Sequence, residues 1–196
     1  MPDIERHITD IRGPHEWAAY DGRTDAAELR AKRLDAAAKA AFNNLRAYSN
    51  CCRSTLWALQ THLDLQGDRA LRATTALAGG IAGTGETCGA VLGALMALGL
   101  STESPGESRQ LAAAFVERFT ERYDGTRCYA VQKATIGWCC DDPSLTEKWI
   151  AVGGPIACAA VCAEAARIAG ALILDARAPA TRTLSHLATV DRRPDA

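Results

Sequence analysis

The sequence predicts an all-α, single-domain helical bundle in which a central apolar helix follows a glycine-rich loop. Alanine and leucine are abundant, and stretches in which β-branched and polar residues alternate are nearly absent, so strands are not expected. Glycine and proline stand between the apolar stretches, where helices begin and end. The 196 residues are enough for one domain with a sizeable core.

Three segments are expected along the chain. Residues 1–24 form an irregular arm, because glycine and proline interrupt any helical pattern there. Residues 25–177 form the helical domain. Residues 178–196 form a polar tail that contains Pro179 and Pro194 and is expected to be disordered.

The first three helices are expected over residues 25–47, 51–62 and 65–78. Asp25 and Asn50 are suited to cap the first two, because their side chains can accept from the free N–H groups of a helix start. The paired glycines Gly79 and Gly80 are expected to end the third helix.

The later helices are expected over residues 86–98, 105–123 and 154–176, with a further helix start at Asp142-Pro143. The helix over residues 86–98 is apolar on every face, so it is expected at the centre of the bundle. Pro105 and Pro155 stand at first helical positions, where proline is favourable.

Charge and hydropathy exclude several classes of function. The net charge of −1 gives no reason to expect a nucleic acid or an anionic membrane as partner. The N-terminus lacks the basic and apolar regions of a signal peptide. The longest apolar stretch is interrupted by Glu164 and Arg167, so we expect a core helix and no membrane span. These features favour the cytoplasm, where thiols serve metals or catalysis more often than structural disulfides.

Eight cysteines are the candidate functional residues. Cys51, Cys88 and Cys128 each follow a cap, glycine or turn signal, and the positive end of a helix dipole favours a thiolate there. Cys158 and Cys162 are four residues apart and share a helix face. The sequence contains no C-x2-C motif, so a metal or redox site would have to gather single cysteines from several helices.

The loop before Cys88 resembles a phosphate-binding loop in part. Residues 80–87 fit the Walker A pattern except that Glu86 replaces the lysine. A carboxylate would repel the phosphates that the lysine neutralises, so we expect no nucleotide binding. The glycines instead allow close approach of the backbone to a neighbouring group.

Four segments carry a resemblance to a known family. They are Asn50-Cys51, the stretch Glu86-Thr-Cys88-Gly-Ala-Val-Leu-Gly93, the helix and turn from Phe115 to Cys128, and Cys158-Ala-Ala-Val161. In these residues the chain resembles the bacterial redox-active family named for its C…GCAxxG…C…C cysteine pattern. The similarity covers roughly residues 45–174.

The resemblance implies a helical redox protein that carries an iron–sulfur cluster or another metal and works with an oxidoreductase or a transporter. It suggests Cys51, Cys88, Cys128 and Cys158 as the four family cysteines. Cys52 competes for the first place and Cys162 for the fourth. The chain departs from the pattern in its long N-terminal arm, its polar tail and its Cys139-Cys140 pair.

The leading hypothesis is therefore a cytoplasmic redox protein with a [4Fe–4S] or [2Fe–2S] cluster on these four thiolates, which passes electrons to a partner oxidoreductase. Gly83, Gly85 and Gly89 would let backbone amides approach the cluster sulfurs. The alternatives are a metal-free thiol oxidoreductase with Cys88 as nucleophile and Cys51 or Cys128 as resolving thiol, and a structural zinc or metal-sensing protein. The sequence leaves open a homodimer.

Overall fold

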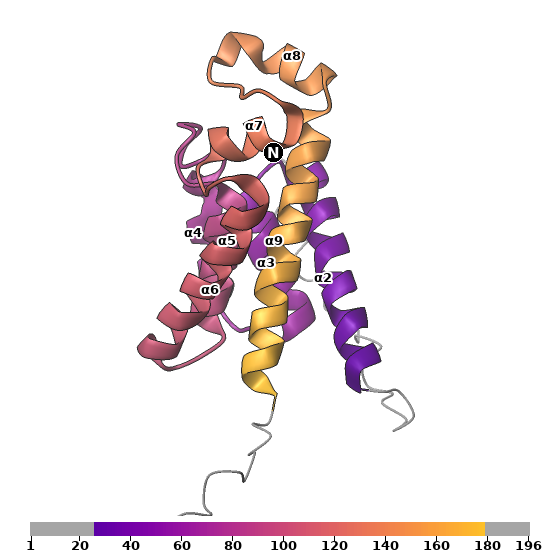
Figure 1. Ribbon diagram of the computed structural model, residues 1–196, viewed down its shortest axis with the longest axis vertical. Coiled ribbons are helices and arrows are strands. Elements are labelled where there is room, and N and C mark those ends of the chain that lie inside the picture. Colours follow the sequence, from indigo (N-terminus) through magenta and orange to yellow (C-terminus); the bar gives the residue numbers. More distant parts are fainter. Residues whose placement is uncertain (1–25, 179–196) are drawn as a thin grey trace, which may run out of the picture.

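The structure, a computed structural model, describes residues 26–178 and is all-α in that range (Figure 1). The predicted bundle is confirmed. The expected arm and nearly all of the expected tail lie outside the described residues, as does Asp25 with its predicted cap.

The two longest helices, α2 (Ala26–Tyr48) and α9 (Gly154–Arg177), pack along each other in antiparallel directions. Their contact is built from small side chains: Ala37, Ala38 and Ala41 on α2, and Ala165, Ala166 and Ala169 on α9, all buried. Gly170 deepens the approach, since a Cβ atom there would lie 2.9 Å from Leu34 Cδ2. Two exposed ion pairs connect α2 and α9: Arg30 with Asp175 at 2.8 Å, and Arg167 with Asp35 at 2.6 Å. Exposed pairs of this kind contribute little to the free energy of unfolding.

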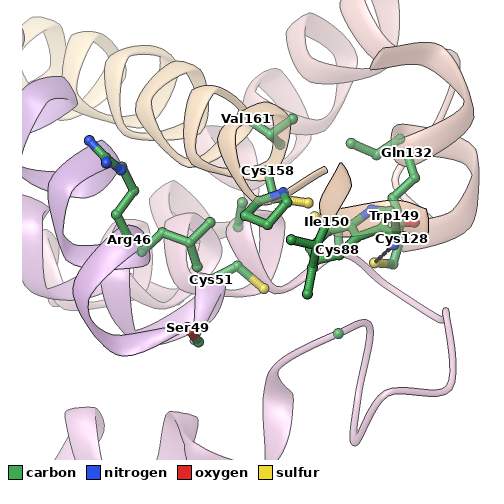
Figure 2. Close-up of a pocket in the computed structure, with 15 residues that line it drawn as sticks. Arg46, Ser49, Cys51, Cys88, Cys128, Gln132, Trp149, Ile150, Cys158 and Val161 are labelled. Carbon is green, nitrogen blue, oxygen red and sulfur yellow. Dashed lines mark hydrogen bonds between the residues drawn. The ribbon is translucent and has the colours of Figure 1, made fainter. Parts of the chain in front are cut away.

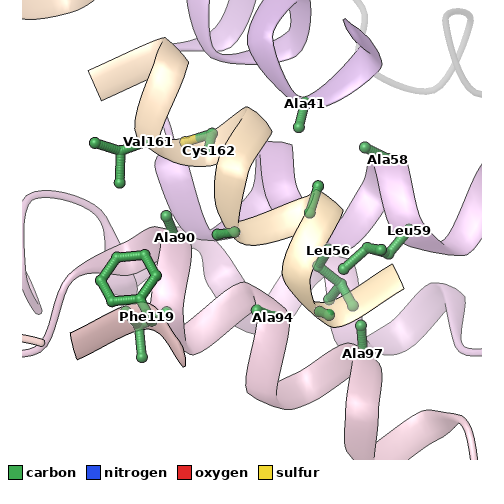
Figure 3. Close-up of a cluster of buried hydrophobic side chains, with 14 of the residues drawn as sticks. Ala41, Leu56, Ala58, Leu59, Ala90, Ala94, Ala97, Phe119, Val161 and Cys162 are labelled. Carbon is green, nitrogen blue, oxygen red and sulfur yellow. The ribbon is translucent and has the colours of Figure 1, made fainter. Parts of the chain in front are cut away.

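The helices α3 (Cys51–Leu63) and α5 (Gly89–Leu100) pack against α9 and against each other. Asn50 caps α3 as predicted, because its Oδ1 accepts from the Arg53 N–H at 3.0 Å. Gly93 lets the two helices approach closely, since a Cβ atom there would lie 2.3 Å from the Cys52 carbonyl oxygen. The apolar side chains of α5, including Ala90, Ala94 and Ala97, meet those of α3 and α9 in the core (Figure 3).

The helix α6 (Pro105–Tyr123) closes the bundle on the other side of α5. Ser104 caps it, and its apolar face buries Phe115 and Phe119, whose rings stack with centroids 5.6 Å apart. The short helices α7 (Cys128–Ile136) and α8 (Thr146–Ala151), with the 3-10 turn η3 (Pro143–Leu145) between them, lie at the end of the bundle where α9 begins (Figure 1).

Two predicted elements differ from the structure. The helix expected over residues 65–78 is split into α4 (Asp68–Ala73) and the 3-10 turn η2 (Thr74–Leu77). It begins late because Asp64 takes a left-handed conformation and Leu65 donates back to the Gln60 carbonyl. The central helix begins at Gly89 and not at residue 86, because residues 86–88 pair with residues 126–128.

Among residues 26–178, α9 is the one helix long and apolar enough to cross a membrane, and half of its most apolar window is buried inside the bundle. The core helix of a bundle is apolar for the same reason, because it packs against other helices, as α9 does here.

Candidate functional site

Four cysteines that are far apart in the sequence line one cavity of about 350 Å³: Cys51, Cys88, Cys128 and Cys158 (Figure 2). All four stand at or near helix starts. Cys51 and Cys128 are the first residues of α3 and α7, Cys88 is the N-cap of α5, and Cys158 lies in the first turns of α9. Cys51, Cys88 and Cys128 therefore stand at the positive ends of three helix dipoles, which favour anions, whereas Cys158 lies one turn into α9.

A short backbone pairing brings Cys88 and Cys128 together. Thr87 and Arg127 form an isolated antiparallel bridge. The Cys88 N–H donates to the Thr126 carbonyl at 2.8 Å, and the Cys128 N–H donates to the Glu86 carbonyl at 2.6 Å. Cys88 and Cys128 therefore lie side by side at the end of the bridge. The helix α5 begins directly after Cys88, and α7 begins at Cys128.

The Cys51 sulfur is held by glycines from two segments. The Gly79 N–H donates to it and opposes the effect of burial on its pKa. On another side, a Cβ atom at Gly89 would lie 2.3 Å from Cys51 Sγ. The absence of a side chain at residue 89 therefore leaves the space that this sulfur occupies.

The helix α8 supplies part of the cavity wall beside Cys158. Trp149 and Ile150 line the cavity together with Pro155. The Trp149 indole packs on Gly154, where a Cβ atom would lie 2.2 Å from Trp149 Cε2. Glycine at the first position of α9 thus lets a large aromatic ring cover this end of the bundle.

The four thiols differ in their affinity for protons. Hydrogen bonding from the Cys88 thiol, and then from Gln132, lowers the pKa of Cys128 from 9.0 to about 7, although burial acts against it. The same bond to Cys128, together with burial, raises the pKa of Cys88 well above its usual value. Burial raises the pKa of Cys158 to about 12 and also raises that of Cys51. Cys128 therefore loses its proton more readily than the other three cavity thiols.

Comparison with known proteins places this cysteine pattern in a family. The family model described as "Putative redox-active protein (C_GCAxxG_C_C)" matches residues 49–172. The chain belongs to this family. No curated protein and no solved structure gives a significant match.

The competing cysteines lie away from the cavity of this C_GCAxxG_C_C protein. Cys52 and Cys162 are fully buried in the core. The Cys52 sulfur lies 3.9 Å from Met96 Sδ, and the Cys162 sulfur lies 3.8 Å from the Cys51 carbonyl oxygen. The half-buried pair Cys139 and Cys140 follows α7, outside the residues that line the cavity.

The glycines expected near a cofactor have different surroundings. A side chain at Gly83 would meet open space, and one at Gly85 would meet the Tyr129 ring at 2.1 Å. Gly89 supports the Cys51 sulfur, and Gly79 is the glycine that lines the cavity.

Sequence reasoning did not single out several other cavity residues, among them Gln132 and Trp149. Gln132 could have been found, since it stands four residues after Cys128 on one helix and so shares its face. Trp149 belongs to a separate short helix, and no local signal connects it to the cysteines.

The donor set fits an iron–sulfur cluster. Among residues 26–178, no group of three or more His, Cys, Asp or Glu side chains is arranged to hold a single metal ion. Metal–sulfur bonds of about 2.3 Å require sulfurs about 3.8 Å apart around one tetrahedral ion, whereas a cubane cluster spans about 6–7 Å. Four cysteine thiols that line one cavity are the donor set that an iron–sulfur cluster uses.

Proposed function

We propose that this C_GCAxxG_C_C protein binds an iron–sulfur cluster through Cys51, Cys88, Cys128 and Cys158 and transfers electrons to a partner oxidoreductase. One observation carries the proposal: the four cysteines that the resemblance suggests line one cavity, although they come from four different helices or helix caps. Four thiolates are the usual complement of such a cluster. A bound cluster supplies one-electron chemistry.

The surroundings of the thiols support this proposal. Burial raises the pKa values of Cys51 and Cys158, and the bond to Cys128 together with burial raises that of Cys88. Positive charge in the cavity would favour the loss of these protons. The helix dipoles and the Gly79 N–H favour the resulting negative charge. Trp149 and Ile150 add apolar surface to the cavity on the side of α8.

Exposed apolar side chains beside the cavity support a protein partner. Ile150, Val152 and Ile156 are 56%, 48% and 50% exposed, and they lie where α8 meets the start of α9. Ile150 also lines the cavity. A redox partner that docks on these side chains would lie next to a residue of the cavity wall, Ile150.

Anaerobic purification with analysis of iron, acid-labile sulfide and visible absorption tests the proposal. We expect a brown protein that loses its absorption when Cys51, Cys88, Cys128 or Cys158 is replaced by alanine. Cys139→Ala is the matched control and should keep the cluster, because residue 139 does not line the cavity. A colourless protein after reconstitution with iron and sulfide, or a cluster that survives Cys88→Ala, would contradict the proposal.

A second function is favoured by the hydrogen bond between the Cys88 and Cys128 thiols. These two could form a disulfide while passing two electrons and two protons to a peroxide or a disulfide substrate. The lowered pKa of Cys128 makes it the nucleophile and leaves Cys88 as the resolving thiol, which is the reverse of the roles expected from the sequence. A colourless protein that reduces peroxide and loses this activity in Cys128→Ser would favour this function.

A further inference from the structure

Gln132 connects the cavity to the loop that carries the additional cysteine pair. The side chain is buried, with 8% of its surface exposed, and both ends of its amide are hydrogen-bonded. Its Nε2 lies 3.5 Å from Cys128 Sγ, and its Oε1 lies 2.9 Å from the Cys140 backbone nitrogen (Figure 2 shows the first contact).

The direction of these bonds follows from their chemistry. The backbone N–H of Cys140 can only donate, so the Gln132 oxygen must face it. The NH₂ group of the amide must then face Cys128 and donate to its sulfur. The Cys88 thiol donates to the same sulfur. Cys128 is thus an acceptor of two hydrogen bonds, one from inside the cavity and one from Gln132.

The loop that orients Gln132 is itself held in place. Gly137 ends α7 in a left-handed conformation with φ of 82° and turns the chain back toward Cys128. After Cys140, the Asp142 side chain accepts from the Ser144 N–H at 2.8 Å and caps η3. The Cys140 N–H is therefore presented to Gln132 from a fixed turn.

We propose that Gln132 is a positioning residue that keeps the Cys128 sulfur a hydrogen-bond acceptor at the cavity wall, and that the backbone of the Cys139-Cys140 loop controls this sulfur through Gln132. The effect on a cluster rests on the proposed function, whereas the effect on the Cys128 thiol does not. A hydrogen bond to a cluster thiolate raises the reduction potential, so Gln132 would tune the potential from outside the ring of ligands.

Three variants separate the two bonds of Gln132. Gln132→Glu keeps an oxygen for the Cys140 N–H and loses the donor to Cys128. Gln132→Met loses both bonds and retains a similar volume. Cys140→Ser changes the side chain of the loop and keeps its backbone N–H. Circular dichroism and thermal melting of all three establish that the bundle is intact.

The first measurement uses the cluster-free protein. Iodoacetamide alkylation at one fixed pH, followed by mass spectrometry, gives separate rates for Cys128 and Cys88. We expect the Cys128 rate to fall about tenfold in Gln132→Glu and in Gln132→Met, the size expected for one lost bond to a charged group. We expect Cys140→Ser to leave that rate within about twofold of the parent. An unchanged rate in folded Gln132→Glu, or an equal fall in Cys140→Ser, would overturn the proposal.

The second measurement uses the reconstituted protein. The midpoint potential should become more negative in Gln132→Glu and also in Gln132→Met, which loses the same donor without adding a charge, and should not change in Cys140→Ser. If no variant and no parent protein binds a cluster, the proposed function fails, and the alkylation rates still decide the role of Gln132. A cluster whose potential is the same in Gln132→Glu and in the parent would contradict the positioning role while leaving the cluster itself established.

Discussion

The Cys51 sulfur occupies the place of a side chain at Gly89: a Cβ atom at residue 89 would lie 2.3 Å from Cys51 Sγ. The same atom would lie 3.0 Å from the Cys52 nitrogen and 3.0 Å from the Leu77 carbonyl oxygen. The start of α5 is therefore shaped around a thiol of α3. Two of the four cavity cysteines, Cys51 and Cys88, depend on this one contact for their relative position.

Gly89→Ala is expected to move Cys51 out of the cavity and to lower the free energy of unfolding by about 1–3 kcal/mol, because backbone atoms surround the new methyl group. Urea denaturation measures the stability, and iron content measures the site. Gly99→Ala in the same helix is the control, since its nearest contact is 3.9 Å away. That change should be neutral or stabilising, and equal effects at both glycines would contradict the prediction.

Leu98→Asp is expected to lower the free energy of unfolding by about 3–5 kcal/mol, because Leu98 is fully buried and a carboxylate there would have no partner. Leu100→Asp, at a site 38% exposed, is the control and should have a small effect. Leu95, on the same helix, is only partly buried and would be a weaker test. A parent-like melting temperature for Leu98→Asp would mean that α5 is not in the core.

The cavity thiols are expected to react at different pH. In the cluster-free protein, alkylation of Cys128 should rise with a midpoint near pH 7, because its pKa is lowered to about 7. Alkylation of Cys158 should rise only toward pH 12, because burial raises its pKa to about 12. Peptide mapping after short pulses of iodoacetamide gives both curves. Coincident curves would show that the thiols do not differ as described.

Stability is expected to decline in alkali. Burial raises the pKa values of Cys52 and Cys158 from 9.0 to about 12 in the folded state. Between pH 9 and pH 12 the unfolded chain therefore loses these protons while the folded chain keeps them, which favours unfolding. Below pH 9 both the folded and the unfolded chain keep these protons, so the two thiols do not make the free energy of unfolding depend on pH. Urea midpoints measured from pH 8 to pH 11 should fall, and the double variant Cys52→Ala/Cys158→Ala should show a shallower fall than the parent.

The glycine loop is expected not to bind nucleotide. Glu86 forms an ion pair with Arg127 at 2.6 Å. The N–H groups of Gly85 and Glu86 donate to Gly79 and Gly80 within the loop, so they are not free to hold phosphates. Titration calorimetry with ATP and magnesium should give no heat of binding. Micromolar affinity would require a different conformation of the loop.

Local signals made most of the helices predictable. Asn50, Ser104 and the turn at Asp124 act within a few residues of the helix ends that they set, so the sequence is sufficient to place those ends. The start of α5 was predicted three residues early because the bridge between Thr87 and Arg127 joins segments 40 positions apart. No pattern within a few residues of α5 predicts such a pairing.

The family resemblance suggested four cysteines that line one cavity in the structure, but it left the choice between neighbouring cysteines open. Cys51 and Cys52 are adjacent on α3, and only the packing of that helix shows that Cys51 lines the cavity while Cys52 contacts Met96 in the core. Cys158 and Cys162 share one face of α9, and their depth in the bundle separates them. The metal-binding role of the four remains a prediction.

The sequence by itself determined an all-α fold and placed Cys51, Cys88 and Cys128 at helix starts, because capping and turn chemistry act over a few residues. Only the tertiary structure decided that these thiols and Cys158 line one cavity, and that Cys128 is the acceptor among them. Those properties depend on burial and on hydrogen bonds between segments distant in the chain, which exist only once the helices have packed.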